Sequence, residues 1–383
     1  MDLSFTPEQQ AFRQEVRAWM EANVPDEPLL TLEGREGYDQ HVEWERKLAE
    51  GNWGMVTWPE AYGGRGLDLI RWLIFEEEYW RAGAPLRANQ NGIFLLGPTI
   101  MEYGTDEQKA RFLTPMARGE KIWAQAWSEP GAGSDMAAIR STARREGDDY
   151  ILNGQKTWSS RAAFADWGFG MFRTDADSKR HKGLSFILFP LDAEGVTIRP
   201  IRQLHGDTGF AEIFLDEVRV PATNCIAGEG EGWSVAMATA GFERGLMLRS
   251  PGRFQAAAQR LVELYRKHRD TASPDAHAAV LQAWMDAEAY ALNTYMVATT
   301  VMNGGHIGAE ASANKIFWSE MDRALHRAGM SLLGAAAELR KLPDGTPNDW
   351  LEGYIFSLSG PIYAGSNEIQ RNIVAERLLG MPR

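Results

Sequence analysis

The sequence predicts an α+β protein with several domains, in which helical regions at both ends flank a central β-domain. Apolar residues recur at helical spacing through residues 1–121 and again through 228–383, whereas short strand-like runs fill residues 122–227. No internal repeat or low-complexity linker interrupts this order. We therefore expect three domains with these bounds.

The N-terminal region begins with a strong helix-start signal. Residues 6–9 (TPEQ) combine an N-cap threonine, a proline at the first helical position and a capping box. An apolar face follows at helical spacing, made of Phe12, Val16, Trp19 and Met20. Further helices are expected over residues 38–50, 67–79 and 105–116.

The central region contains the Asn-Gly pair that marks many β-hairpins. The run Tyr150–Trp158 places Asn153 and Gly154 between two strand-like halves, which predicts a hairpin with its turn at this pair. Further strands are expected over residues 183–190, 196–201 and 211–220.

The C-terminal region is helical again. An apolar-periodic pattern extends from Trp233 to about Arg269, and Pro251 within it predicts a kink. Ser273 caps a helix that is expected to reach Met302. Two more helices are expected over residues 309–333 and 366–379, with a loop at 342–349 between them.

Composition and charge exclude several classes of function. The net charge of -12 leaves no basic excess to offset phosphates, so we expect no nucleic-acid partner. No apolar run reaches the ~18 residues that cross a bilayer, so no membrane association is expected. The N-terminus lacks the pattern of a secretion signal and Cys225 is the only cysteine, which together indicate a cytoplasmic protein. The seven histidines show no metal-ligand spacing, so no metal is expected.

Residues 126–135 (AWSEPGAGSD) form a distinctive loop. Its glycines predict a tight turn with exposed backbone N–H groups, which suits a phosphate or another anion. The same pattern is also typical of an ordinary turn, so both interpretations stay open. Residues 228–233 (GEGEGW) lack the last glycine of a dinucleotide-binding loop and its βαβ surroundings. We interpret them as the flexible start of a helix.

Two further stretches are candidates for chemistry. Trp158, followed by two serines, either faces a ligand or packs as a strand residue in a core. Glu243 lies in an otherwise apolar helix, where a carboxylate costs free energy unless it is paired and its pKa tends to rise. That environment suits a general base, but an ion pair with Arg244 is the simpler interpretation from spacing alone.

Five ordered motifs resemble the acyl-CoA dehydrogenase family over essentially the whole chain. SEPGAGSD at 128–135 is similar to the family's TEPGAGSD signature, and NGQKTWSS at 153–160 is similar to its NGxKxWI(T/S) segment. The other three motifs are YGTDEQKARFLTP at 103–115, DEVRVPATNCIAGEGEGW at 216–233 and GPIYAGSNEIQRNIVAERLLGMPR at 360–383. Ordered motifs of this length make the resemblance highly specific.

This resemblance implies a fold and a reaction. The fold is an N-terminal helical domain, a β-barrel-like middle domain and a C-terminal four-helix bundle, assembled as a homotetramer or heterotetramer with FAD between subunits. The reaction oxidises an acyl-CoA thioester to the trans-2-enoyl-CoA: a carboxylate removes the α-proton and flavin N5 accepts the β-hydride. Electrons then pass to an electron-transfer flavoprotein. The protein supplies a dry site for the base and stabilises the thioester oxygen as charge develops there.

The matched motifs also assign site residues by resemblance. Four of them would lie along the isoalloxazine ring: Trp127, Ser128, Trp158 and Ser160. The two serines would hydrogen-bond the polar edge of the ring. Ser134 would lie near the flavin pyrophosphate and the substrate. Two further FAD contacts would come from the C-terminal segment, at Ser366 and Glu368.

The base position departs from the commonest family pattern. Many members use the glutamate of a Tyr-Glu-Gly-Thr run, but Ala364 stands at that place here and cannot act as a base. A minority places the base in a helical Glu-Arg pair, which Glu243 and Arg244 match. The resemblance therefore implies Glu243 as the base, because a carboxylate from either site can reach the same α-carbon. Ala364 would hold the thioester oxygen through its backbone N–H, and Arg244 and Tyr363 would border the substrate.

Two more departures concern the C-terminal region. HRDTASPDAH at 268–277 lacks the family's Arg-x-x-Phe-Gly run, and LLGAA at 332–336 replaces its FGG-type loop. With the Glu-Arg base, these features resemble actinobacterial-type members that act on sterol side chains or other bulky acyl-CoAs. Two alternatives therefore stay open: a partner subunit of a heterotetramer with an incomplete FAD site, and an acyl-CoA oxidase- or desulfinase-like flavoprotein.

Overall fold

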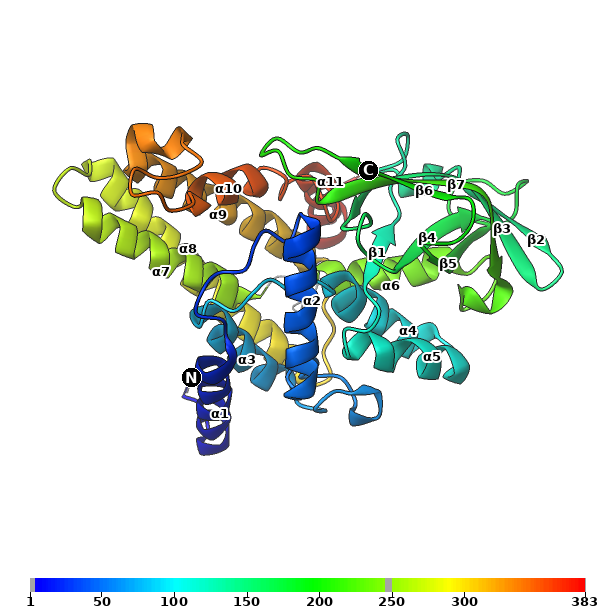
Figure 1. Cartoon of the computed structure of the whole chain (residues 1–383), viewed down its shortest axis with the longest axis horizontal. Helices are drawn as coiled ribbons and strands as arrows, with labels where there is room; N and C mark the ends of the chain where they lie inside the picture. Colours follow the sequence, from blue (N-terminus) through cyan, green and yellow to red (C-terminus); the bar gives the residue numbers. More distant parts are fainter. Residues whose placement is uncertain (1–3, 245–249, 383) are drawn as a thin grey trace. The chain divides into compact units, whose positions relative to one another are not determined.

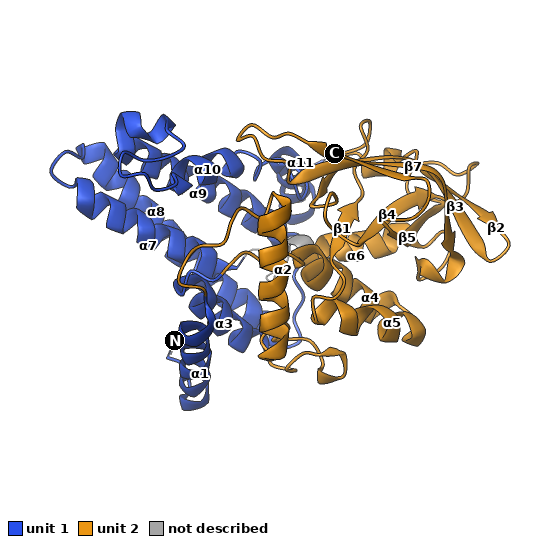
Figure 2. Cartoon of the chain, in the orientation of Figure 1, with its two compact units in different colours: residues 1–24, 68–84, 244–383 blue, residues 25–67, 85–243 orange. Residues whose placement is uncertain are grey.

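The computed structural model describes residues 4–244 and 250–382, without the side chains of Glu243 and Arg244 (Figure 1). The chain forms two compact units, and each is assembled from segments that are far apart in the sequence (Figure 2). The helical unit contains residues 1–24, 68–84 and 244–383, and the sheet unit contains residues 25–67 and 85–243.

The helical unit is built around a core shared by its long helices. Phe254 of α7 meets Tyr290 of α8 edge-on at 5.3 Å between ring centroids, and stacks on Trp318 of α9 at 6.3 Å. The helices of this unit are α1 (Pro7–Asn23), α3 (Leu69–Arg81), α7 (Pro251–His268), α8 (Pro274–Met302), α9 (Glu310–Leu333), α10 (Asp349–Ser357) and α11 (Asn367–Ile373), followed by a π-helical turn (Val374–Leu378).

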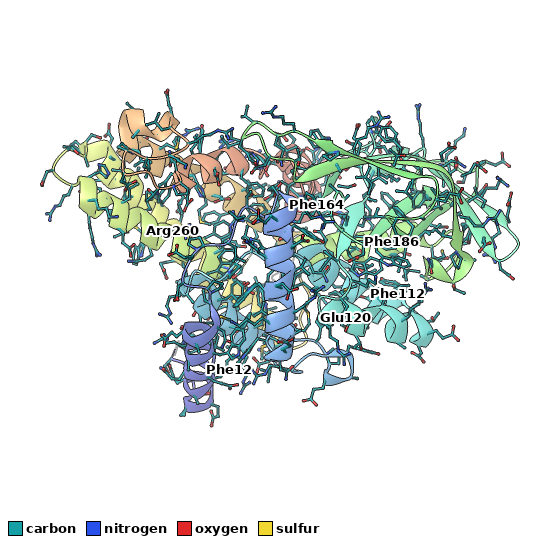
Figure 3. The ribbon with its side chains drawn as sticks, viewed as in Figure 1. Phe12, Phe112, Glu120, Phe164, Phe186 and Arg260 are labelled. Atoms are coloured by element: carbon teal, nitrogen blue, oxygen red, sulfur yellow. The ribbon has the colours of Figure 1, made fainter. Side chains whose placement is uncertain are left out.

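The predicted start of the first helix is confirmed. Thr6 caps α1 and exchanges two hydrogen bonds with Gln9, which completes the capping box. Phe12, Val16 and Met20 are buried, and Phe12 is labelled in Figure 3. Capping residues predicted this boundary well because a cap is a local hydrogen bond that the sequence alone can specify.

The predicted long helix with a kink at Pro251 is wrong. Pro251 is the first residue of a separate helix, α7, whose N-cap is Ser250. The Ser250 side chain accepts the Gly252 N–H at 3.2 Å. Proline is tolerated at a first helical position because its missing N–H would have no partner there, so the same residue that suggested a kink instead starts a helix.

The sheet unit contains a mixed sheet in the strand order β6-β7-β3-β2-β4-β5-β8, with β1 added in parallel to β4. Phe186 of β5 and Phe112 of α5 are among the labelled side chains of this unit in Figure 3. Its strands are β1 (Trp123–Ala126), β2 (Thr142–Glu146), β3 (Asp149–Ser160), β4 (Trp167–Arg173), β5 (Leu184–Pro190), β6 (Val196–Ile201), β7 (Phe210–Pro221) and β8 (Cys225–Ile226). Its helices are α2 (Arg35–Glu50), α4 (Gly97–Tyr103), α5 (Asp106–Ala117) and α6 (Gly232–Arg244), with a π-helical turn (Gly92–Leu96) before α4.

The predicted hairpin turn at Asn153-Gly154 is wrong. These residues lie inside β3, and the hairpin turn is at residues 147–148, between β2 and β3. The pairing of β3 with β7 shifts between Leu152 and Gly154, which is a bulge. Gly154 has φ +143°, and a Cβ there would lie 2.2 Å from Ser141 Oγ. The Asn-Gly pair therefore serves a bulge with close packing and not a turn.

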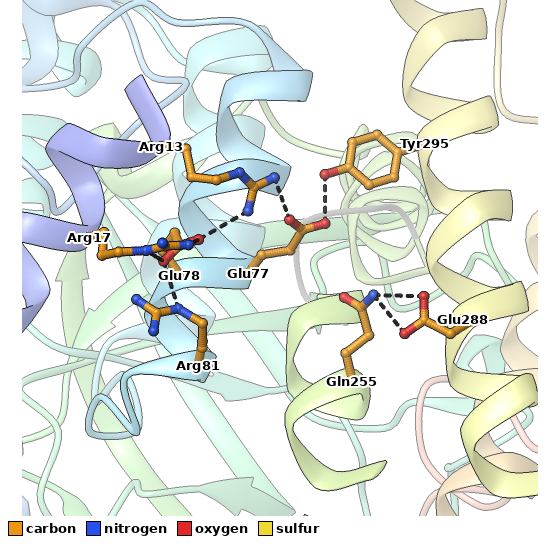
Figure 4. A network of polar contacts seen from close by, with 8 residues as sticks. All are labelled: Arg13, Arg17, Glu77, Glu78, Arg81, Gln255, Glu288 and Tyr295. Carbon is orange, nitrogen blue, oxygen red and sulfur yellow. Dashed lines mark hydrogen bonds and ion pairs between the residues drawn. The ribbon is translucent and has the colours of Figure 1, made fainter. Parts of the chain in front are cut away.

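A carboxylate cluster ties α1 to α3 in the helical unit (Figure 4). Glu78 is almost completely buried, and its oxygens accept hydrogen bonds of 2.8–3.0 Å from Arg13, Arg17 and Arg81. The neighbouring Glu77 accepts from Tyr295 Oη at 2.6 Å and pairs with Arg13 at 2.7 Å. Burial by itself raises the pKa of Glu78, but the three guanidinium groups lower it to about 2.

We predict that Glu78→Gln destabilises the protein at neutral pH by about 2–3 kcal/mol. The folded pKa of about 2 lies below the ordinary glutamate value of 4.5, which the unfolded chain has. The stabilisation by the carboxylate is therefore fully present above pH 4.5 and is lost as the pH falls toward 2. Urea unfolding should show a difference between wild type and variant that shrinks through this range.

The exposed Arg35–Asp39 pair provides the control for this experiment. Asp39→Asn should change the free energy of unfolding by less than about 0.5 kcal/mol at any pH in the series. A Glu78→Gln difference that stays constant between pH 7 and pH 3 would contradict the assigned pKa.

Candidate functional site

The segment that follows β1 is anchored beside β3. The Thr157 N–H donates to the Ser128 carbonyl at 2.8 Å, so the predicted flavin residues on the two segments lie in adjacent stretches of backbone. Trp127 is buried and meets Phe169 and Phe186 edge-on. Its Nε1–H has no hydrogen-bond partner among the described residues. Buried donors are rarely left unpaired in proteins, so this group is available to a ligand.

Trp158 is displayed on the surface of the sheet unit. Its side chain is 60% exposed and its φ is +58°, an unusual value for a residue with a side chain. The register of β3 against β7 shifts between Lys156 and Ser159, which accommodates this conformation. The neighbouring Ser159 is fully buried, and its Oγ has no partner within the described chain. The alternative that Trp158 packs in a core is wrong, and Ser160 lies half-buried beside it.

The 129–135 loop closes as a tight turn. Glu129 and Ala132 exchange two backbone hydrogen bonds of 3.0 Å. Gly131, Gly133 and Ser134 are exposed, and no atom lies within 4 Å of the Cβ position of either glycine. The turn predicted from the sequence is present, and its outer side is open to a ligand.

A buried ion pair fixes the base of this loop. Lys156 Nζ lies 2.8 Å from Glu129 Oε1, and it also donates to the Met171 carbonyl at 2.6 Å. The same carboxylate accepts the backbone N–H groups of Arg140 and Ser141 at 2.7 and 2.9 Å. One side-chain pair thus joins the loop, β3 and β4.

Burial dominates the electrostatics of this pair. Desolvation lowers the pKa of the Lys156 ammonium to about 8, although the Glu129 charge opposes the shift. Burial alone would raise the pKa of Glu129, but Lys156 and the surrounding N–H donors lower it overall. Both groups are charged at neutral pH, because each offsets part of the desolvation cost of the other.

A second polar centre anchors β1 itself. The Asn89 side chain accepts the Trp123 N–H at 3.1 Å and donates to the Met116 carbonyl at 3.1 Å. The Asn89 N–H in turn donates to Glu45, which forms a buried ion pair with Arg87. Buried hydrogen bonds therefore hold the first residue of β1, at the opposite end of the strand from Trp127.

Helix α6 carries the predicted base near its end. Glu243 and Arg244 belong to the helix, but their side chains lie outside the described residues, so the base assignment remains a prediction. One turn earlier, Thr239 Oγ1 lies 2.8 Å from Thr99 Oγ1 of α4, and both side chains are fully buried. This pair fixes the depth of α6 in the sheet unit one turn before Glu243.

The C-terminal residues of the predicted site belong to the helical unit. Ala364 has φ +57° and Gly365 has φ +76°. Ser366 is the N-cap of α11, with its Oγ accepting the Ile369 N–H at 3.4 Å, and Glu368 is exposed. Tyr363 contacts Trp318 at 6.0 Å between ring centroids. In the described chain the Ala364 N–H has no backbone acceptor.

Three family profiles match the chain in order. They describe the acyl-CoA dehydrogenase N-terminal domain at residues 6–120, the middle domain at 124–218 and the C-terminal domain at 230–379. The chain belongs to the acyl-CoA dehydrogenase family.

Similar proteins include members from Mycobacterium tuberculosis (strain ATCC 25618 / H37Rv). The chain is 39% identical to acyl-CoA dehydrogenase IpdE1 of this strain, over 97% of both proteins. Among solved structures, the ChsE4–ChsE5 complex from Mycobacterium tuberculosis is 32% identical with a TM-score of 0.85, over 100% of both chains. The Tcur3481–Tcur3483 steroid ACAD is 29% identical with a TM-score of 0.87, also over 100% of both chains.

These matches confirm the predicted family, its order of helices, sheet and helices, and the enzyme class, an acyl-CoA dehydrogenase of actinobacterial type. Acyl-CoA dehydrogenases are flavoproteins. Residues 4–244 and 250–382 contain no helix long and apolar enough to cross a membrane. The same residues contain no cluster of three side chains suited to a metal ion.

The sequence alone did not single out the Lys156–Glu129 pair, although the two residues lie within the SEPGAGSD and NGQKTWSS motifs. The available signal was a lysine within a predicted strand, because a buried lysine needs an acidic partner. Side chains alternate between the two faces of a regular strand, so Lys156 and Trp158 would be assigned to the same face. The bulge between them, which the sequence does not reveal, places Lys156 inside and Trp158 outside.

We predict that Lys156→Met lowers the free energy of unfolding by about 3 kcal/mol, because it leaves the buried Glu129 carboxylate without its cation. We also expect the purified acyl-CoA dehydrogenase to contain less flavin per chain. Chemical unfolding and the visible absorbance of the purified protein measure the two effects.

Asp135→Asn is the matched control, because it breaks the exposed Asp135–Arg180 pair on the same loop. Its expected effect on stability is below about 0.5 kcal/mol. Equal effects of the two substitutions would contradict the role of the buried pair.

Proposed function

We propose that the chain is an FAD-dependent acyl-CoA dehydrogenase for bulky, sterol-derived acyl-CoA thioesters, with Glu243 as the base. The substrate class is supported by the similarity to the Tcur3481–Tcur3483 steroid ACAD. The observation that carries the base assignment is Ala364, because the position at which many members of this family carry a glutamate has no carboxylate here.

The residues of the sheet unit suit the isoalloxazine part of FAD. Trp127 Nε1–H and Ser159 Oγ–H are buried donors without partners in the described chain, and Trp158 offers an exposed aromatic face. Ser128 and Ser160 add hydroxyl groups on the same two segments, and Ser134 lies on the open turn. When bound, FAD supplies the acceptor for the hydride. The protein's own contribution is an aromatic and hydrogen-bonding frame.

The proton side of the reaction is assigned to α6 and the Ala364 turn. The Glu243 carboxylate would take the α-proton as the Cα–Cβ double bond forms, and the β-hydrogen would leave with its electron pair to the acceptor that FAD supplies. The Ala364 N–H donates to the thioester oxygen and so stabilises the charge that develops there. Arg244 and Tyr363 border the acyl-CoA, while Ser366 and Glu368 extend the FAD site.

We predict that Glu243→Gln lowers the rate of flavin bleaching by an acyl-CoA at least about 10³-fold, because the amide cannot accept the proton. The flavin content should not change. The measurement is anaerobic mixing with a panel of short, medium, branched and steroid-derived acyl-CoAs, followed by absorbance of the oxidised flavin.

The control is Glu231→Gln, which changes an exposed glutamate just before the same helix. Its bleaching rate should equal that of the wild type. Adding Ala364→Glu to Glu243→Gln should restore part of the lost rate, because it returns a carboxylate to the other base position. Wild-type bleaching by Glu243→Gln would remove Glu243 from the mechanism.

A second candidate function is that of one subunit in a heterotetramer that passes electrons to an electron-transfer flavoprotein. Both similar solved proteins carry two component names, and this chain lacks the Arg-x-x-Phe-Gly run. An apolar stripe on one face of α8 supports a subunit interface. It consists of the exposed residues Leu281, Met285, Leu292 and Met296.

Purification distinguishes the two assemblies. If the heterotetramer is correct, the chain expressed alone is colourless and becomes yellow only when a second acyl-CoA dehydrogenase chain of the same organism is co-expressed. A yellow, active tetramer of this chain alone, measured by light scattering, would leave the homotetramer as the functional form.

A further inference from the structure

The Gln370 side chain holds the turn that contains Ala364. Its Nε2 donates to the Ala364 carbonyl at 3.0 Å and to the Gly365 carbonyl at 3.2 Å. Gln370 is fully buried, and in the described chain its Oε1 has no partner. Both N–H bonds of one amide are thus directed at two successive peptide planes.

This amide is itself firmly placed. Gln370 belongs to α11, and the preceding Asn367 anchors that helix to α9. Asn367 Oδ1 accepts from the buried Lys315 Nζ at 2.8 Å, and its Nδ2 donates to Ser319 Oγ at 3.1 Å. The Asn367 N–H also donates to the Pro361 carbonyl at 2.8 Å, which closes the loop across the turn.

The turn needs such support because of its conformation. Ala364 adopts φ +57°, a left-handed value that costs free energy for a residue with a Cβ. Gly365 follows at φ +76° and would permit many other conformations. Without the two hydrogen bonds from Gln370, the peptide planes on either side of Gly365 lose their only side-chain partner among the described residues and can rotate further.

We infer that Gln370 is a positioning residue for the reaction: its amide holds the two peptides that follow Ala364 and thereby the backbone conformation at Ala364, which directs the Ala364 N–H toward the thioester oxygen. This inference rests on the proposed function of Ala364. Gln370 does not touch the substrate. It acts by fixing the Ala364 carbonyl, which limits the rotation of ψ at Ala364 and therefore the direction of the N–H on the other side of the same residue.

Such a role has a specific kinetic signature. The hydrogen bond to the thioester oxygen strengthens as negative charge develops, so a misdirected N–H raises the barrier more than it weakens substrate binding. Loss of the two hydrogen bonds from Gln370 should therefore lower kcat and leave KM nearly unchanged. A purely structural role would instead lower stability or flavin content without this separation.

The test compares Gln370→Met with Gln259→Met in the flavin-loaded protein. Methionine keeps the length of the side chain but cannot donate, and Gln259 is an exposed glutamine that bonds only to Glu263 among the described residues. We expect Gln370→Met to lower kcat about 10- to 100-fold with KM within about twofold. Gln259→Met should match the wild type.

Two further measurements do not depend on turnover. The first is deuterium exchange at the α-carbon of a 3-thiaacyl-CoA, which can lose its α-proton but cannot release a β-hydride. The second is the infrared frequency of a ¹³C-labelled thioester carbonyl in the bound analogue. Gln370→Met should slow the exchange about 10-fold. It should also shift the carbonyl frequency toward the value in a solvent without hydrogen-bond donors, because the bond from the Ala364 N–H to the thioester oxygen is weaker.

Gln370→Asn provides the second variant if Gln370→Met does not fold. Its shorter amide can reach at most one of the two carbonyls, so an intermediate loss of exchange rate is expected. Exchange and carbonyl frequency equal to those of the wild type in either folded variant would overturn the positioning role. No exchange in the wild-type protein would instead contradict the proposed function.

Discussion

The ion pair between Lys156 and Glu129 is the constraint on which the flavin side of this protein depends. The 129–135 loop has exposed glycines without neighbours near their Cβ positions, so its own packing cannot fix it. A carboxylate can accept an ammonium and two backbone N–H groups at once, which no apolar side chain could do. The pair adds little net stability, because burying two charges is costly. Its effect is to join the loop to β3 and β4 in one geometry.

Much of the fold could be predicted because residues close in sequence specify where its helices begin. Thr6 and Ser273 specify helix starts through hydrogen bonds within three residues, and both were found from the sequence. The two wrong predictions concern residues that are compatible with more than one local structure. Pro251 fits a kink or a first helical position, and Asn153-Gly154 fits a turn or a bulge. Ser141, which closes against Gly154, is distant in sequence and gave no signal.

The candidate site was less accessible to such reasoning. Whether Trp158 faces solvent or a core depends on a bulge in β3 that is set by the pairing with β7. Resemblance to a family located Trp127, Ser128 and Ala364, but it could not reveal which groups hold them. Lys156 and Gln370 act through partners elsewhere in the chain, and both donate hydrogen bonds to backbone carbonyls. Every residue has such a carbonyl, so the sequence does not indicate which one is the acceptor.

The assembly of each unit from separate segments has a consequence for the order of events during synthesis. The chain changes unit at residues 24/25, 67/68, 84/85 and 243/244. All residues of the sheet unit are synthesised before those of α7, α8 and α9, whereas α3 packs against α7 and α8 and can do so only after those helices have been made. Nascent chains therefore expose part of the apolar surface of α3 until late in translation, and an exposed apolar surface of this kind is prone to aggregation. Glu243 is the last residue of the earlier unit to be made.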